Sequence, residues 1–209
     1  MPSYGPVSQT ARILGLETVP LSRIPTDEAW RIDREEWAKI LVQVDLLMIS
    51  PQLNPVGWSY TESDRKWLVE FCIKHDINVI SDEVYSGADR NWKPFFKEGK
   101  NFITISSLTK VHGLGVVRYG WICADREIIR YIGRSFHNME GMMASPTIRI
   151  VEQIKDRLNE PVELIEQYRE ENLPILQESL TRLGIKWTPP PTGVFLSLIH
   201  ISEPTRLRR

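Results

Sequence analysis

Residues 104–121 read TISSLTKVHGLGVVRYGW. In this stretch a single lysine, Lys110, follows several hydroxyl side chains, and Arg118 stands eight positions after it. The flanking segments 101–105 (NFITI) and 119–124 (YGWICA) are apolar and typical of buried strands. An amine and a guanidinium between two buried strands fit a role in solubility poorly. We therefore expect this segment to hold an anionic, covalently reactive ligand.

The composition of the chain excludes several classes of protein. Of 209 residues, 42% are apolar and 25% charged, with a net charge of −1, which predicts a soluble globular protein that binds neither nucleic acid nor a membrane. The apolar runs are too short to span a bilayer, and the first ten residues lack a secretory pattern. Cys72 and Cys123 have no CxxC partner, so we expect buried thiols and a cytoplasmic location. The histidine spacing predicts no metal site.

Short apolar strands alternate with amphipathic helices along the first two thirds of the chain. This alternation predicts an α/β fold with a largely parallel sheet. Thr61 is the expected N-cap of one helix. The expected helices cover 7–16, 33–43 and 61–76, and the expected strands cover 17–21, 45–50, 77–84, 102–107 and 116–124.

The character of the chain changes between residues 135 and 146, where we expect a domain boundary. From there to about residue 183 the pattern is helical, with Pro161 and Pro174 as expected breaks or kinks. Strands are expected at 185–188 and 193–196, around the turn PPPTG. The predicted domains are residues 1–136 and 137–195.

Polar residues follow three of the expected strands. Asn54 lies in the loop after the strand 45–50, Asp82 and Tyr85 lie at the end of 77–84, and Lys110 follows 102–107. The carboxyl ends of parallel strands form the usual binding edge of an α/β sheet. Each residue alone also has a plainer explanation, namely a turn, a helix N-cap or a solvated lysine.

Taken in order, these residues and Arg118 resemble the class I/II aminotransferases, which are pyridoxal-phosphate enzymes of fold type I. The resemblance runs from about Met1 to Phe195 and includes the opening PSYGP and the late PPPTGVF. It implies part of the large cofactor-binding domain, a mainly parallel sheet with flanking helices, followed by part of an α+β small domain. Val56 replaces the family's usual threonine, and Gly115–Val116 replaces a common Pro-Gly.

The resemblance also implies catalytic roles. Lys110 would form the Schiff base with the aldehyde of pyridoxal 5'-phosphate, and its freed amine would then move the α-proton. Asp82 would keep the pyridine nitrogen protonated, so that the ring can accept electrons. Tyr85, the third expected catalytic residue, would hydrogen-bond the phenolic oxygen of the cofactor.

The remaining expected cofactor contacts are Asn54, on the same phenolic oxygen as Tyr85, and Ser107 and Arg118, on the phosphate. Ser106 is a second hydroxyl that strand alternation would turn away from the site. Four neighbours are expected to serve structure rather than chemistry: Glu83, His112, Trp58 and Tyr60.

The function implied is amino transfer from an amino acid to a 2-oxo acid, in a homodimer. One alternative keeps the cofactor but changes the reaction to that of a lyase, decarboxylase or cyclase. Another is a pyridoxal-phosphate-binding regulatory domain without turnover. The sequence leaves the donor and acceptor undetermined.

The resemblance begins in the middle of the family's large domain. We expect the phosphate-binding helix turn and the arginine that binds the substrate carboxylate to lie outside the 209 residues, which leaves the fragment inactive. Residues 196–206 (LSLIHISEPTR) resemble the translation of a transposon-derived sequencing adapter. We therefore expect 196–209 to be a non-native tail.

Overall fold

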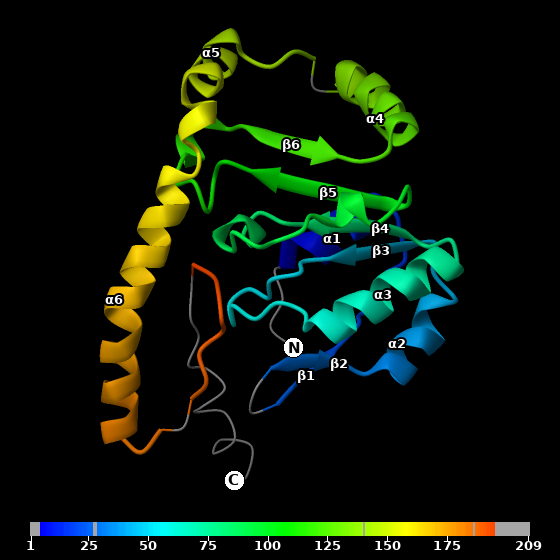
Figure 1. Cartoon of the computed structure of the whole chain (residues 1–209). Helices are drawn as coiled ribbons and strands as arrows, with labels where there is room; N and C mark the ends of the chain where they lie inside the picture. The colour runs from blue at the N-terminus through cyan, green and yellow to red at the C-terminus, as the bar shows by residue number, and fades with distance from the viewer. Residues whose placement is uncertain (1–4, 27–28, 140, 186, 195–209) are drawn as a thin grey trace.

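A four-stranded sheet forms the centre of the computed structural model, which describes residues 5–26, 29–139, 141–185 and 187–194 (Figure 1). The strand order is β3-β4-β5-β6. The first three strands are parallel and the last is antiparallel to its neighbour. This sheet confirms the expected α/β fold. The bounds are β3 (Leu46–Ile49), β4 (Asn78–Asp82), β5 (Phe102–Ser107) and β6 (Gly120–Cys123).

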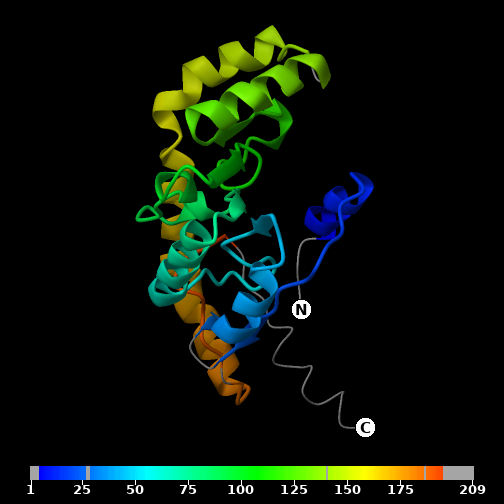
Figure 2. The same ribbon diagram turned by 90° about the vertical axis from the view of Figure 1, so that its right-hand side faces the viewer.

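Three helices in the first half of the chain match the predicted ones: α1 (Gly5–Ile13), α2 (Arg34–Leu41) and α3 (Glu62–Lys74). Side chains cap two of them, and the cap at Thr61 confirms the prediction. Asp33 accepts hydrogen bonds from two backbone N–H groups at the start of α2, and Thr61 accepts one from Asp64 at the start of α3. α1 and α3 lie on opposite sides of the sheet (Figures 1 and 2).

The main core lies between the sheet and the helices α2 and α3. Leu41, Leu68, Val79, Phe95 and Phe102 are fully buried there. Phe95 comes from a short 3-10 helix, η2 (Phe95–Lys97), and its ring stacks on that of Phe102 with centroids 6.1 Å apart. This packing fixes the positions of β4 and β5, whose ends carry most of the candidate site.

A small antiparallel hairpin replaces the strand expected at 17–21. It consists of β1 (Arg23–Pro25) and β2 (Trp30–Ile32), which pair from Arg23↔Ile32 to Pro25↔Trp30. Residues 17–21 are extended but belong to no strand, so that prediction was wrong. Pro20 has no N–H to donate to a ladder, whereas the hairpin pairs its two strands with each other.

The last strand of the sheet begins later than expected. Residues Gly115–Val117 form a 3-10 turn, η3, and β6 begins at Gly120 instead of residue 116. Arg118, between the two elements, has φ 52°, in the left-handed region. A strand cannot continue through that backbone conformation, so the turn ends before the ladder with β5 begins.

The second half of the described chain is helical, as predicted. It contains α4 (Arg126–Met139), α5 (Ser145–Ile154), the 3-10 turn η4 (Lys155–Arg157) and α6 (Glu160–Arg182), which runs along one side of the molecule (Figure 1). Pro161 lies in the first turn of α6, where no N–H is needed. Pro174 lies inside α6 and does not end it, which excludes the break among the two predicted outcomes, a break or a kink: a helix of 23 residues loses only one bond of its ladder.

The described residues that follow α6 do not form the two strands expected there. Residues 185, 187–190, 193 and 194 are extended or bent without ladder partners, so the expected strands are not present in the part of 185–196 that the structure describes. The tail expected at 196–209 lies outside the described residues. In place of ladder partners, the side chains of Gln52 and Arg169 donate to the backbone carbonyls of Thr192 and Pro190.

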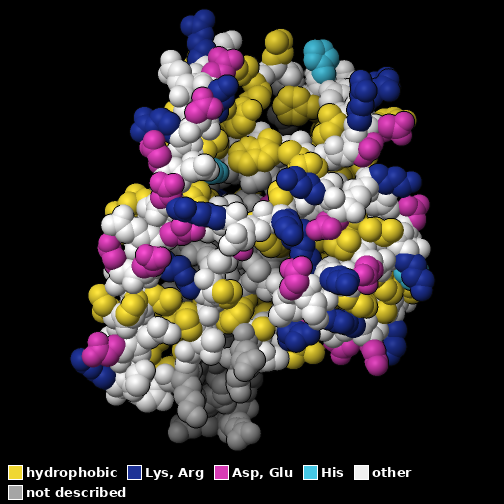
Figure 3. Space-filling model, viewed as in Figure 1, with side chains coloured by type: hydrophobic (Ala, Val, Ile, Leu, Met, Phe, Trp, Pro, Cys, Tyr) yellow, Lys and Arg dark blue, Asp and Glu magenta, His cyan; other side chains and the backbone are white. Residues whose placement is uncertain are grey.

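Exposed apolar side chains gather where α4, α5 and β6 meet (Figure 3). Tyr131, Met139 and Met142 are 71%, 79% and 88% exposed, and none of the residues of α4 or α5 is buried. None of the helices in the described ranges is both long and apolar enough to cross a bilayer.

Candidate functional site

Strands β3, β4 and β5 bring the candidate residues to one edge of the sheet. Asp82 is the last residue of β4 and Ser107 the last of β5, while Asn54 and Lys110 follow β3 and β5 in short loops. Because these strands are parallel, all of their carboxyl ends face the same side. The antiparallel β6 contributes its beginning to that edge, which places Arg118 there as well.

The loop after β3 holds Asn54 opposite Tyr85. The Asn54 amide Nδ2 donates to the Tyr85 hydroxyl at 3.5 Å. Two backbone bonds close the loop: Leu53 N–H donates to Trp58 O at 2.8 Å, and Gly57 N–H donates to Leu53 O at 2.7 Å. Gly57 has φ 79°, a conformation that favours glycine. The loop is thus a fixed support for the Asn54 amide.

Lys110 lies beside the Tyr85 ring and within electrostatic reach of Asp82. Its Nζ is 5.8 Å from the ring centroid of Tyr85, and its side chain is exposed. Burial raises the pKa of Asp82, whose Oδ1 accepts the Val84 N–H at 3.2 Å, and the charge of Lys110 acts in the opposite direction. A primary amine, a phenol and a desolvated carboxylate therefore share one site.

Ser107 and Arg118 lie at the same end of the β5–β6 pair. Ser107 pairs with Gly120, and Leu108 N–H donates to Tyr119 O at 3.0 Å, so the pairing brings the segment after Ser107 beside Arg118. The Ser107 hydroxyl accepts the Thr109 N–H at 3.3 Å and shares a short hydrogen bond with the Thr109 hydroxyl. The Arg118 side chain is exposed and makes no ion pair with any described residue.

Two neighbours of the site belong to the framework, as expected. Glu83 is 4% exposed, and its carboxylate accepts hydrogen bonds from Trp92 Nε1 at 2.7 Å, Phe95 N–H at 2.9 Å and Thr104 Oγ1 at 2.8 Å. The Ser106 hydroxyl donates to Glu83 O at 3.3 Å. Glu83 therefore ties η2 to the sheet and is not available for chemistry.

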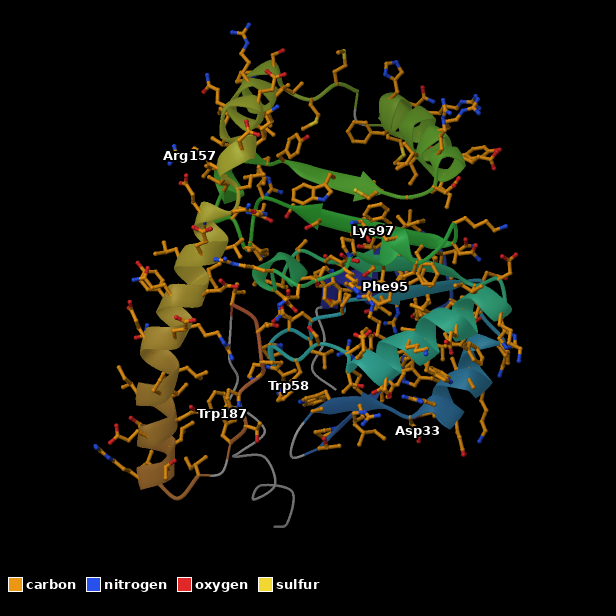
Figure 4. The ribbon with its side chains drawn as sticks, viewed as in Figure 1. Asp33, Trp58, Phe95, Lys97, Arg157 and Trp187 are labelled. Atoms are coloured by element: carbon orange, nitrogen blue, oxygen red, sulfur yellow. The ribbon has the colours of Figure 1, made fainter. Side chains whose placement is uncertain are left out.

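The other expected framework residues also make packing or backbone contacts. His112 Nδ1 lies 3.1 Å from Leu158 O, which links the lysine loop to the end of η4, and burial lowers its pKa. Trp58 packs against the small cluster that contains Trp30 and lies at the loop after β3, above the β1–β2 hairpin (Figure 4). Tyr60 meets the Trp37 ring edge-on at 6.3 Å.

Two residues that sequence reasoning missed support the Asn54 loop. Arg23 is 5% exposed and donates to backbone carbonyls at both ends of the loop. Gln52, 2% exposed, donates from Nε2 to Gly57 O at 3.2 Å and to Thr192 O at 3.4 Å. The next residue, Gly193, has φ 120°, and a Cβ there would overlap the Gln52 amide. A polar residue in a short strand or loop carries no periodic signal, so the sequence could not single these out.

Comparison with known proteins connects this arrangement to a family. The family model described as aminotransferase class I and II matches residues 1–205. The chain belongs to the class I and II aminotransferase family. Among its relatives, the probable kynurenine–oxoglutarate transaminase of Saccharomyces cerevisiae is 24% identical over 195 residues, covering 84% of this chain and 42% of the relative. The histidinol-phosphate aminotransferase of Pyrococcus furiosus is 27% identical over 172 residues, covering 81% and 48%.

Solved structures share the fold of this class I/II chain. The pyridoxal-phosphate-bound C–S lyase from Staphylococcus hominis superposes with a TM-score of 0.78 at 20% identity, covering 92% of this chain and 51% of the lyase. A double mutant of Thermus thermophilus aspartate aminotransferase also gives a TM-score of 0.78 at 20% identity, covering 92% and 52%. The chain spans about half the length of the curated relatives it matches.

Proposed function

We propose that the protein to which this chain belongs is a pyridoxal-phosphate-dependent aminotransferase that moves an amino group from an amino acid to a 2-oxo acid. The observation that carries the proposal is the convergence of the Lys110 amine, the Tyr85 phenol and the desolvated Asp82 carboxylate at one sheet edge. Family membership and the relatives named as transaminases support it.

The donor set fits the cofactor. When bound, pyridoxal phosphate supplies a carbonyl group for an amine and a ring that accepts electrons. Lys110 is the amine that would bind the carbonyl and, once released, move a proton at the substrate Cα. Asp82 would hold a proton on the ring nitrogen; the burial that raises its pKa also strengthens a pairing with a cationic N–H.

The remaining residues would orient the cofactor. Asn54 and Tyr85, already 3.5 Å apart, would donate to the ring oxygen. Ser107 and the exposed Arg118 would bind the phosphate, the arginine through charge-assisted hydrogen bonds. These assignments leave Glu83 and His112 to the framework.

The first test is the site of covalent attachment. Borohydride reduction of the protein in the presence of pyridoxal phosphate, followed by peptide mapping, should place the label on Lys110. Lys97 and Lys100 precede Lys110 in the sequence and lie outside its loop, so they serve as internal controls. A label on either of them, with Lys110 unmodified, would contradict the assignment.

A second candidate is a lyase with the same cofactor, because the C–S lyase fold matches as well as that of the aminotransferase. A panel of amino acids with 2-oxoglutarate or pyruvate separates the two reactions. Amino transfer consumes the oxo acid and yields a new amino acid, whereas a lyase releases ammonia and an oxo acid from the donor alone. For the 209-residue chain alone, which spans about half its relatives, we expect cofactor contact without turnover.

The family resemblance also supports proposals on the domains, the oligomeric state and the location of the protein. We propose a large-domain part at residues 1–136, a small-domain part at 137–195, a homodimer and a cytoplasmic location. Light scattering of the protein in solution tests the dimer, and limited proteolysis tests the boundary, since cleavage should concentrate between residues 135 and 146.

A further inference from the structure

Arg23 is a buried arginine with an unusual set of partners. Its Nη2 donates to Ser50 O at 3.1 Å and to Pro51 O at 2.9 Å, and its Nη1 donates to Trp58 O at 3.4 Å. Only 5% of the residue is exposed. Burying a guanidinium costs more free energy than burying an apolar side chain of similar size. The arrangement therefore calls for an explanation beyond filling space.

The Tyr60 ring fixes the orientation of the Arg23 guanidinium. Its Cζ lies 3.6 Å from the centroid of the Tyr60 ring. Burial lowers the pKa of Arg23, and its interactions with Tyr60 and Asp64 oppose that shift. A planar guanidinium over an aromatic ring has its donors fixed in one plane. This orientation directs them at carbonyls on two separate stretches of chain.

Those two stretches are the two ends of the loop that carries Asn54. Ser50 and Pro51 follow β3 directly, and Trp58 closes the loop by accepting the Leu53 N–H at 2.8 Å. Arg23 belongs to a different element, the β1 strand of the hairpin. It thus joins the entrance and the exit of the loop from outside, and Asn54 lies between them.

We propose that Arg23 is a positioning residue that holds Asn54 at the distance from Tyr85 that the cofactor's ring oxygen requires. This inference rests on the proposed function. If the clamp is loosened, the loop can spread, and the Asn54 amide leaves its place beside the Tyr85 hydroxyl. Loss of that hydrogen bond would change the proton affinity of the group formed between Lys110 and the cofactor.

The test compares Arg23→Met with Arg31→Met. Arg31 lies opposite Ile24 in the same hairpin, and its guanidinium pairs with Asp64 at 2.7 Å rather than with the carbonyls of the loop. In the protein without cofactor, amide hydrogen exchange at Leu53 and Gly57 is measured relative to that of Val79 in β4, which corrects for the lost Asp64 ion pair in Arg31→Met. This ratio should rise about tenfold in Arg23→Met and stay within about twofold of the parent in Arg31→Met. Unchanged exchange in Arg23→Met would show that Arg23 does not hold the loop and would overturn the proposal.

The second readout is the pH titration of the absorbance of bound pyridoxal phosphate. Its midpoint should move by about half a pH unit or more in Arg23→Met and not in Arg31→Met. Faster exchange with an unmoved midpoint would reduce Arg23 to a fold-stabilising role and overturn the positioning claim. Arg23→Lys keeps the charge but cannot reach three carbonyls, so it should shift the midpoint in the same direction even if Arg23→Met fails to fold.

The two proposals fail in different ways. Absence of pyridoxal phosphate binding by the unmodified protein would overturn the proposed function and the positioning role with it. Normal binding and labelling of Lys110 in the parent, with an Arg23→Lys titration that coincides with the parent's, would overturn the positioning role alone.

Discussion

The Asn54 amide and the Tyr85 hydroxyl lie 3.5 Å apart, although they belong to loops that follow two different strands. Because β3 and β4 are parallel neighbours, their following loops meet at one edge. The pair therefore offers two donors toward the same point, next to the Lys110 amine 5.8 Å from the Tyr85 ring.

Tyr85→Phe should keep the ring beside Lys110 and remove only the hydroxyl. A hydrogen bond contributes about 1 kcal/mol, so we expect turnover of the whole enzyme to fall about fivefold while Lys110 remains the labelled residue. Steady-state kinetics and reductive labelling measure the two effects. Tyr168→Phe, an exposed tyrosine on α6, is the matched control. Unchanged turnover in Tyr85→Phe would exclude the hydroxyl from the mechanism.

Asp82→Asn should separate stability from activity. Burial raises the pKa of Asp82, so the folded state prefers the neutral acid, and the carboxylate costs stability at every pH above that raised pKa. The cofactor-free variant should therefore resist urea better than the parent at pH 7. The difference should shrink as the pH falls through the raised pKa of folded Asp82 and vanish below the ordinary value of 3.8. Its single-turnover rate should nevertheless fall about a hundredfold or more, as for loss of a group that controls a proton.

The control for this variant is Asp89→Asn, which keeps the local turn on the surface and should change neither quantity. An Asp82→Asn enzyme that works within a few-fold of the parent would remove Asp82 from the assigned role. A variant that is less stable than the parent at pH 7 would contradict the raised pKa.

Asp64 should make the protein sensitive to acid. Burial alone would raise its pKa, but hydrogen bonds from Arg31 and Arg34, the Ile32 N–H and Thr61 lower the pKa to about 2. A carboxylate with a lowered pKa contributes stability that is complete above its ordinary value of 3.8 and lost as the pH falls toward 2. The shift corresponds to about 2 kcal/mol.

Urea unfolding of the parent and of Asp64→Asn between pH 2 and 6 would measure this term. The stability difference between the two proteins should be large at pH 6 and shrink by about 2 kcal/mol toward pH 2. Asp156→Asn, at an exposed position in η4, should track the parent throughout. A difference between parent and Asp64→Asn that does not depend on pH would refute the lowered pKa.

Glu83 should be indispensable to the fold while playing no part in the chemistry. Glu83→Ala would leave three buried donors, from Trp92, Phe95 and Thr104, without an acceptor, at about 1–3 kcal/mol each. Glu83→Gln keeps one acceptor oxygen and should be destabilised less than Glu83→Ala. Equilibrium unfolding gives both values. Equal stability of the parent and Glu83→Ala would mean that these hydrogen bonds do not support η2.

The sequence predicted the sheet well because its strands are continuous apolar runs. The strand predicted at 102–107 coincides with β5, and β3 and β4 fall inside their predicted ranges. The hairpin was missed because strands of three residues are too short to show an alternation. Pro174 was taken as a break or kink because a local rule cannot see that a long helix tolerates one lost bond.

The candidate site was predictable to the extent that it follows strand ends. Asn54, Asp82 and Lys110 could be placed on one edge from the order of strands alone. Arg23 could not, since its role depends on the hairpin folding against the loop of residues 50–58, which brings together segments about 30 residues apart. A contact of this kind leaves no trace in spacing or periodicity.

The close approach of Gly193 to Gln52 has a consequence for how variation would be tolerated along this gene. Any side chain at position 193 would press on a buried amide that is bonded to the loop of Asn54, and φ 120° already disfavours every other residue. In a saturation mutagenesis experiment, Gly193 would therefore score with Asn54 and Tyr85, about 140 and 110 positions upstream. Because of that contact, the effects of substitutions at positions 52 and 193 should be non-additive.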